Sequence, residues 1–358
     1  MTANGSVRIA VVGCGYWGVN YVRSIADMPE TTLAALCDVD ANRLNEMARR
    51  YPSARMAEDI DDLLARDDFD AAVVSTSAAS HYRIASALLE YGKHVLIEKP
   101  MTTDVGDAAR LVEMADAAAL KLMVGHIFLF NTGIETIKRY LVSGDLGQPY
   151  YLYARRTNLG PIRDDVNALW DLATHDVSIF NYLLDRAPDW VSAVGSTVLH
   201  TDRQDVGFIV LGYPDGILGH IHVSWADPHK VRELVVVGSK ERIAFDDLDA
   251  TEKVRVFEKG ITAVADEPAS FGEYHLSIRD GDIISPHVSI SEPLKKQIKH
   301  FADCVLNDRR PLSDGLNGLE VVRVMAAVDE SVARHGAPVV LEAMIPQREE
   351  TWTPMFHS

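Results

Sequence analysis

A short glycine-rich segment has the spacing of a phosphate-binding turn. Residues 13–18 read G-x-G-x-x-G and follow an apolar run over residues 7–12. The first glycine allows a tight turn, the second lets the backbone approach a pyrophosphate, and the third lets a helix pack close to the strand. The alternative is a glycine turn that binds nothing. We predict a dinucleotide site that includes Gly13, Gly15, Tyr16, Trp17 and Gly18.

Asp38 ends the second apolar run, twenty residues after Gly18. A carboxylate at this place accepts hydrogen bonds from the hydroxyls of an adenosine ribose and repels the 2′-phosphate of NADP. Arg43 lies five residues further on, but no basic residue directly follows Asp38. We therefore predict NAD as the cofactor, with NADP as the less favoured choice.

Two further apolar runs end in residues that carry chemistry. The run over 71–75 leads into Thr76, Ser77 and His81, and the run over 94–97 leads into Glu98, Lys99 and Pro100. In a parallel sheet the carboxyl ends of the strands form the ligand crevice. We expect all six residues beside the nicotinamide half of the cofactor. For Lys99, the alternative is an ion pair on the surface.

Asp171 and His175 are spaced as i and i+4 in a predicted helix over residues 169–184. That spacing places them on one face, where a carboxylate can orient an imidazole that takes a proton. An unperturbed histidine titrates near ~6.5, so the oxidative rate should rise with pH around that value. The alternative is a first-turn acid and a surface histidine. Asp176 falls on the apolar side, and we expect it to be hydrogen-bonded.

Three arginines precede this helix, at positions 155, 156 and 163. In an acidic chain they suggest an anionic substrate such as a nucleotide diphosphate or a carboxylated sugar. The alternative is a set of surface charges on an edge strand. The residues that we predict to line the substrate are Arg156, Asn158, Arg163, Asn167 and Trp170.

The elements that position these residues change character along the chain. Strands and helices alternate over about the first 125 residues, which predicts a doubly wound α/β domain over residues 1–126. From 127 to 345 we expect an α+β domain with a mostly antiparallel sheet, whose C-terminal helices can pack back on the first domain. Its predicted elements are strands 148–157, 190–200, 205–212, 216–226, 231–238 and, more weakly, 252–257, a loop over 261–291, and helices 292–307 and 315–335.

Composition narrows the class of protein. The 358 residues carry a formal charge of −17, which disfavours binding to nucleic acid or anionic lipid. No apolar stretch is long enough to span a membrane, and the first residues do not resemble a secretory signal. Three dispersed cysteines without metal-ligand spacing indicate reduced thiols, a cytoplasmic location and no metal site.

Taken together, these motifs resemble the Gfo/Idh/MocA oxidoreductases over nearly the whole chain. The likeness rests on the G-x-G-x-x-G turn, the Ser75-Thr-Ser segment with His81, the Glu98-Lys99-Pro100 tripeptide and Asp171-x-x-x-His175. It implies a Rossmann domain followed by an α+β domain whose open sheet forms homodimers or homotetramers. It also implies that Lys99 and His175 are the catalytic pair, that Asp171 completes the site, and that Glu98 and Pro100 shape the nicotinamide pocket. Ser77-Ala78 departs from the prolines of many members.

The activity that this resemblance implies is NAD-dependent oxidation of a secondary alcohol on a sugar or polyol, or the reverse reduction. His175 would take the hydroxyl proton and Lys99 would donate a hydrogen bond to the oxygen. The segment 155–163, with Asn167 and Trp170, looks similar to members that act on nucleotide sugars, so we expect a nucleotide-linked hexose. A free polyol such as inositol is the alternative substrate. A non-catalytic NAD sensor or subunit is the alternative class.

Overall fold

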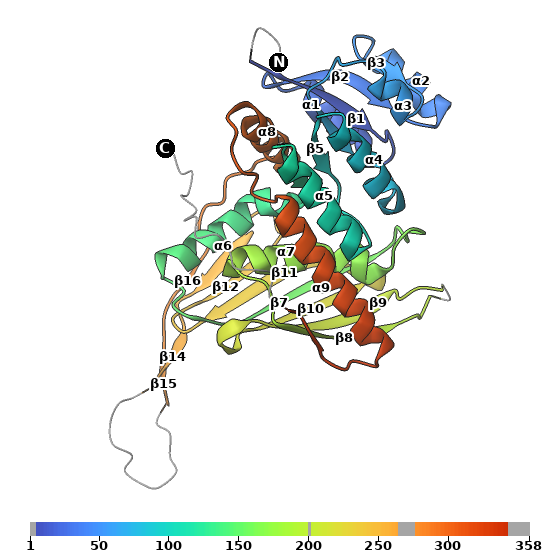
Figure 1. Cartoon of the computed structure of the whole chain (residues 1–358). Helices are drawn as coiled ribbons and strands as arrows, with labels where there is room; N and C mark the ends of the chain where they lie inside the picture. The colour runs from blue at the N-terminus through green and yellow to red at the C-terminus, as the bar shows by residue number, and fades with distance from the viewer. Residues whose placement is uncertain (1–4, 200–201, 264–275, 343–358) are drawn as a thin grey trace.

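The computed structural model describes residues 5–199, 202–263 and 276–342, and the chain is organised around two sheets (Figure 1). The first sheet is parallel throughout, with the strand order β3-β2-β1-β4-β5-β6. Its strands are β1 (Val7–Val12), β2 (Thr31–Cys37), β3 (Arg55–Ala57), β4 (Ala71–Val74), β5 (His94–Ile97) and β6 (Leu122–Val124).

Helices connect these strands in the alternation that the sequence predicts. They are α1 (Gly18–Ala26), α2 (Ala41–Arg50), α3 (Ile60–Leu64), α4 (Ala78–Glu90) and α5 (Val105–Ala117). The central strands β1 and β4 are almost entirely buried, which explains why Arg8 is the one residue in them that is not apolar. The predicted doubly wound α/β architecture is confirmed, and the structure adds its strand order, 3-2-1-4-5-6.

The second sheet has nine strands in the order β16-β13-β12-β11-β7-β10-β9-β8-β17. Its strand pairs are antiparallel except for β7 with β10, so the prediction of a mostly antiparallel sheet is confirmed. The strands are β7 (Pro149–Leu159), β8 (Trp190–Ser196), β9 (Val206–Gly212), β10 (Leu218–Ser224), β11 (Ala226–Gly238), β12 (Arg242–Asp246), β13 (Val254–Phe257), β16 (Ile283–Ile284) and β17 (Val339–Val340).

Two predictions about this domain need correction. No strand was predicted at β12, which pairs with β11 in the middle of the sheet. The segment 261–291 was predicted to be a loop, but it contributes β14 (Gly260–Ala263), β15 (Leu276–Arg279) and β16. Strands β14 and β15 pair as a hairpin that projects from the body of the molecule (Figure 1). Residues 264–275 lie outside the described residues.

Within the described ranges, one face of the nine-stranded sheet is covered by helices and the other is not. Side chains from β8, β9 and β10 that point to the covered face, such as Ile209 and Ile221, are fully buried beneath α7 (Thr174–Leu184) and α9 (Gly315–Ala333). Alternate residues point the other way. We call this second surface the open face; it carries Tyr151, Val194, Phe208 and Leu218, each between 43% and 48% exposed.

The last two helices pack on the first domain, and α9 contacts the second sheet as well. α8 (Pro293–Leu306) packs on α1 and β1, while α9 packs on α5 and β6 and also on β8 (Figure 1). The remaining helix, α6 (Thr132–Ser143), follows a 3-10 turn over Ile127–Phe130. No helix within the described ranges is long and apolar enough to cross a membrane.

Candidate active site

The glycine turn after β1 has the geometry that a pyrophosphate site requires. Gly13 has φ +94°, and a Cβ there would lie 2.8 Å from the carbonyl oxygen of Ser75. A Cβ on Gly18 would lie 1.9 Å from the carbonyl oxygen of Gly13, so the start of α1 can approach β1 only through glycine. Both positions therefore require glycine, and the close approach that they allow brings the start of α1 to the end of β1, a cradle that fits a dinucleotide.

Asp38, at the end of β2, is held beside this turn. Its carboxylate accepts hydrogen bonds from the backbone N–H of Cys14 at 2.6 Å and of Asp40 at 2.8 Å. Asp40 in turn caps α2, as its sequence position predicts, by accepting from the N–H groups of Asn42 and Arg43. A surface hollow adjoins the turn, lined by Cys14, Gly15, Tyr16, Val19, Asn20, Arg43 and Glu46. Tyr16 is 88% exposed at its rim.

Glu98, directly after β5, is buried among hydrogen-bond donors. One carboxylate oxygen accepts from the indole N–H of Trp17 at 2.5 Å and from the hydroxyl of Tyr21 at 2.6 Å, and the other accepts from the Lys99 N–H at 3.0 Å. Burial raises the pKa of the Glu98 carboxyl, while the hydrogen bonds from Tyr21 and Trp17 and the charge of Lys99 act in the opposite direction. Trp17 thus reaches from the glycine turn to the end of β5.

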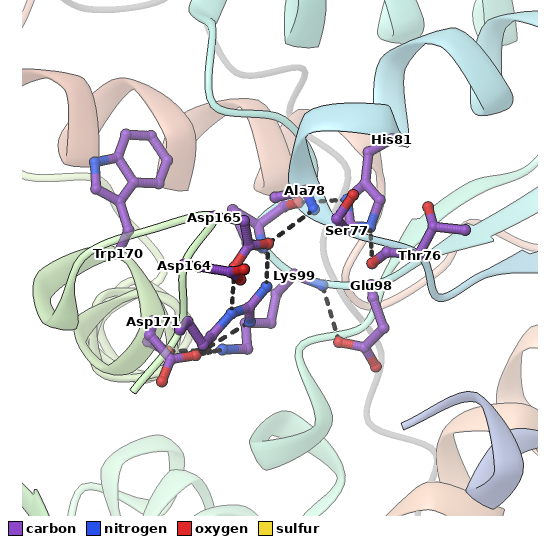
Figure 2. Close-up of polar contacts among 12 residues, drawn as sticks. Thr76, Ser77, Ala78, His81, Glu98, Lys99, Asp164, Asp165, Trp170 and Asp171 are labelled. Atoms are coloured by element: carbon purple, nitrogen blue, oxygen red, sulfur yellow. Dashed lines mark hydrogen bonds and ion pairs between the residues drawn. The ribbon is translucent and has the colours of Figure 1, made fainter. Parts of the chain in front are cut away.

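The segment after β4 lies next to this position (Figure 2). His81 is 1% exposed, and its ring lies between the carbonyl oxygens of Pro100 at 2.9 Å and Thr76 at 3.2 Å. Both ring nitrogens are therefore occupied by backbone atoms, and His81 holds the Thr76–Ser77 turn against the cis Lys99–Pro100 peptide rather than facing a ligand. Ser77 precedes the first residue of α4, and Thr76 accepts a hydrogen bond from Ser80.

Lys99 and Asp171 meet between the two sheets (Figure 2). The Lys99 ammonium donates to the Asp171 carboxylate at 2.9 Å and to the carbonyl oxygen of the same residue at 2.6 Å. Arg163 donates to the same carboxylate at 3.2 Å and forms a bidentate pair with Asp165. Asp165 also accepts from the N–H of Ala78 at the start of α4. These contacts connect both predicted domains, and the two cations lower the pKa of Asp171.

His175 does not receive the hydrogen bond that the i, i+4 spacing predicted. The first turn of the predicted helix is π-helical over Leu169–Ala173, and the Asp171 carboxylate contacts Lys99, Arg163 and the indole N–H of Trp225. The expected support of His175 by Asp171 is therefore wrong in this structure. Asp171 orients the ammonium of Lys99 instead.

The His175 imidazole is held in its neutral form. Burial, together with the charges of Lys99 and Arg156 and the neighbouring His126, lowers its pKa well below the usual value for histidine. Its Nδ1 has no hydrogen-bond partner among the described residues, and Phe128 packs edge-on against the ring at 5.1 Å between centroids. A neutral imidazole next to a lysine can accept a proton without first losing one.

Most of the residues predicted to line the substrate have structural partners. Arg156 is 6% exposed and forms a bidentate pair with Asp176, which confirms the expectation that Asp176 is hydrogen-bonded. The Trp170 indole N–H donates to Asp329 of α9 at 2.7 Å and points away from the Lys99 cluster (Figure 2). These contacts place the Arg156 and Trp170 side chains in the packing of the second domain, not on a substrate surface.

The two asparagines of the same prediction also form hydrogen bonds within the protein. Asn158 donates to the carbonyl oxygen of Gly160. Asn167 accepts from the backbone N–H of Trp170 at 2.9 Å and donates to Gln204 at 3.1 Å, so it caps the π-helical turn. Of the five predicted substrate residues, Arg163 contacts Asp171 of the candidate catalytic group with its side chain, and Asn167 accepts a hydrogen bond from the Asp171 backbone N–H through its carbonyl oxygen at 2.9 Å.

His126 is a site residue that the sequence analysis did not single out. It is 2% exposed, and neither ring nitrogen has a partner in the described part of the chain. Burial and the nearby charge of Lys99 lower its pKa to about 3. The pairing of the two strands places His126 beside Lys99. Val124 of β6 pairs with Ile97 of β5, so the residues that follow each strand lie side by side.

These features define a dinucleotide-dependent oxidoreductase with a second domain that completes the site. Two family models match the chain: the oxidoreductase family with an NAD-binding Rossmann fold over residues 7–126, and the GFO/IDH/MocA C-terminal domain over residues 134–244. The chain belongs to the GFO/IDH/MocA oxidoreductase family. No cluster of three or more metal-ligating side chains occurs in the described ranges.

Characterised relatives cover most of the chain. UDP-N-acetylglucosamine 3-dehydrogenase from Acidithiobacillus ferrooxidans is 27% identical over 91% of this chain and 97% of its own length. Myo-inositol 2-dehydrogenase from Thermotoga maritima is 26% identical over 71% of this chain and 79% of its own. The crystal structure of the WlbA dehydrogenase from Bordetella pertussis, in complex with NADH and UDP-GlcNAcA, has a TM-score of 0.80 at 21% identity and covers 96% of this chain and 100% of that one.

Proposed function

We propose that this protein is an NAD-dependent dehydrogenase that interconverts a secondary alcohol and a ketone on the sugar ring of a nucleotide-linked hexose. The observation that carries the proposal is the meeting of Lys99, from the end of β5, with Asp171 and His175, from the start of the helix in the second domain. A site formed by both domains can hold a sugar against a dinucleotide.

In this mechanism, bound NAD supplies the hydride acceptor. His175, neutral at physiological pH, takes the proton of the reacting hydroxyl, because a free alcohol is too weak an acid to lose it unaided. The ammonium of Lys99 donates a hydrogen bond to the oxygen as negative charge develops there. Asp171 fixes the direction of that ammonium through its carboxylate and its carbonyl oxygen.

The similarity to a UDP-sugar dehydrogenase supports a nucleotide-linked substrate, whereas the three arginines at positions 155, 156 and 163 do not. Arg155 pairs with Glu233, Arg156 with Asp176, and Arg163 with Asp165 and Asp171, so each is already neutralised by a carboxylate. The UDP-N-acetylglucosamine 3-dehydrogenase matches along nearly its whole length, further than the inositol dehydrogenase from Thermotoga maritima. Trp225, which contacts Asp171, lines a hollow where we place the nucleotide; its other lining residues are Ile162, Arg163, Asp164, Asp202 and Arg203.

The environment of Asp38 supports NAD rather than NADP as the cofactor. Its carboxylate already accepts two backbone N–H groups, which fix it at the end of β2, where a ribose 2′-phosphate would meet its charge. Arg43 is paired with Asp40 at 3.4 Å, which reduces the positive charge available to a phosphate.

The open face supports assembly into a homodimer or homotetramer. Phe208 stacks on His222 at 4.4 Å between centroids, and Arg155 and Glu233 neutralise one another in the same cross-strand row. Exposed aromatic and aliphatic side chains beside this neutralised pair favour contact with a second copy, because the contact removes apolar surface from water.

The experiment is a measurement of NADH formation with NAD and a panel of UDP-N-acetylglucosamine, its uronic acid, myo-inositol and free glucose. Turnover on the UDP-linked sugars supports the proposal. Turnover on myo-inositol alone would establish the free-polyol alternative, which the inositol dehydrogenase relatives favour. Tight NAD binding with no turnover on any of these would point to the non-catalytic alternative.

A further inference from the structure

Glu98 is a buried carboxylate without a cation of its own. Within the described residues it forms no ion pair; its three donors are the neutral groups of Trp17, Tyr21 and the Lys99 backbone. The Lys99 ammonium, the nearest candidate, is engaged by Asp171. Removing a carboxylate from water is costly unless a positive charge or several hydrogen bonds compensate it. Here the hydrogen bonds are present and the positive charge is not.

Counted together with Glu98, the charged side chains around it carry more negative than positive charge. Lys99 and Arg163 are the cations at this end of the cleft, and Asp165, Asp171 and Glu98 are the carboxylates. Two positive groups face three negative ones, so one negative charge is left over. Because Asp165 and Asp171 pair directly with the two cations, the excess lies on Glu98.

Several parts of the fold fix Glu98 in this position. Tyr21, fully buried in α1, donates to Glu98 and accepts at 2.9 Å from the side chain of Gln297, which comes from α8 near the end of the chain. Gly125, next to the end of β6, leaves room for the carboxyl group, since a Cβ there would lie 3.0 Å from its oxygen. Contacts from α1, α8 and the end of β6 therefore hold the Glu98 carboxylate in one position.

We propose that Glu98 sets the redox preference of the cofactor site, so that it binds the positively charged oxidised nicotinamide more tightly than the neutral reduced one. The ends of β4, β5 and β6 form the crevice that receives the nicotinamide half in a Rossmann fold, while Asp38 marks the adenosine half at β2. The oxidised ring is the cation that the buried carboxylate lacks. Tyr21 and Gln297 are positioning residues that act through Glu98.

The test is the ratio of the Kd for NADH to the Kd for NAD⁺, measured by calorimetric titration of the full chain without any sugar. In Glu98→Gln the ratio should fall about tenfold or more, because the loss of one charge in a buried site weakens only the binding of the cation. Asp38→Ala is the matched control at the adenosine end: it should weaken both forms together and leave the ratio unchanged. An unchanged ratio in Glu98→Gln overturns the proposal.

Tyr21→Phe provides a second readout that does not depend on the folding of Glu98→Gln. Loss of the hydroxyl removes a hydrogen bond to the ionised form, which raises the pKa of Glu98 further. As the pH is lowered, Glu98 becomes protonated and the preference for NAD⁺ is lost. This loss should occur at a higher pH in Tyr21→Phe than in the wild type. The same pH dependence in both proteins would overturn the proposal. Because no sugar is present, failure of the proposed substrate would leave this result unaffected.

Discussion

The Lys99 ammonium lies 2.9 Å from the carboxylate of Asp171, although the two residues are 72 positions apart, Lys99 after strand β5 and Asp171 in the π-helical turn before α7. Asp171 therefore acts on the lysine and not on His175, four residues further along. Two residues that act as one unit show non-additive effects when both are changed. This contact indicates which pairs of substitutions should have non-additive effects on kcat.

We predict strong coupling between Lys99 and Asp171. Lys99→Ala should lower kcat by roughly 10²-fold or more, and Asp171→Asn should lower it less. The double variant should be about as slow as Lys99→Ala alone, since Asp171 has no ammonium left to orient. Steady-state rates of the four proteins test this. The double variant of Asp171→Asn and His175→Ala serves as the comparison. In it the two fold decreases in kcat should multiply.

The pH profile should lack a histidine step near neutrality. Because the pKa of His175 lies well below its usual value, the ring loses its proton at a lower pH than a free histidine does. The kcat for sugar oxidation should therefore stay level between about pH 6 and pH 8 and fall only below this range. A step centred near ~6.5, as the sequence alone suggested, would contradict the buried environment of His175.

Asp38→Ala should change the choice of cofactor. Without the carboxylate, the repulsion of a 2′-phosphate disappears, so the ratio of the Kd for NADP to the Kd for NAD should fall by about tenfold. Asp59→Ala is a useful control, since the Asp59 carboxylate caps α3 by accepting from the backbone N–H of Asp62. Equal Kd ratios in the wild type and Asp38→Ala would show that Asp38 does not discriminate between the cofactors.

The open face should hold copies of the chain together. Phe208→Glu places a charge in the centre of this surface and should convert the assembly to monomers in sedimentation or light-scattering measurements. Val142→Glu introduces the same charge on α6, where the side chain is 59% exposed and distant from the open face, and should leave the mass unchanged. A monomeric wild type at micromolar concentration would refute this assembly.

The cofactor half of the site could be read from the sequence because its signals are local. Gly13 and Asp38 directly follow short, mostly apolar strands, Gly18 begins the helix after the first of them, and the parallel sheet brings such strand ends to one edge. Lys99 was placed correctly at this edge by the same reasoning. His126 follows a strand in the same way, but only the pairing of β5 with β6 shows that it lies beside Lys99.

The second domain was harder to predict because its contacts are formed over long separations. The π-helical turn breaks the regular spacing on which the Asp171–His175 pairing depended. Arg156 looked available for a substrate, yet Asp176 neutralises it from a helix twenty residues away, and Trp170 is held by Asp329. Nothing in the local sequence indicates which charged groups will be paired in the folded chain.

The most direct test of the proposed chemistry is the rate of NADH formation from NAD and UDP-N-acetylglucosamine by the wild type and by His175→Ala, with the Kd for NAD measured on both. If His175 takes the hydroxyl proton, the variant should be slower by roughly 10²–10⁴-fold while its Kd for NAD stays nearly the same, since the imidazole acts on the sugar. A His175→Ala protein that retains the full wild-type rate would show that another group takes the proton.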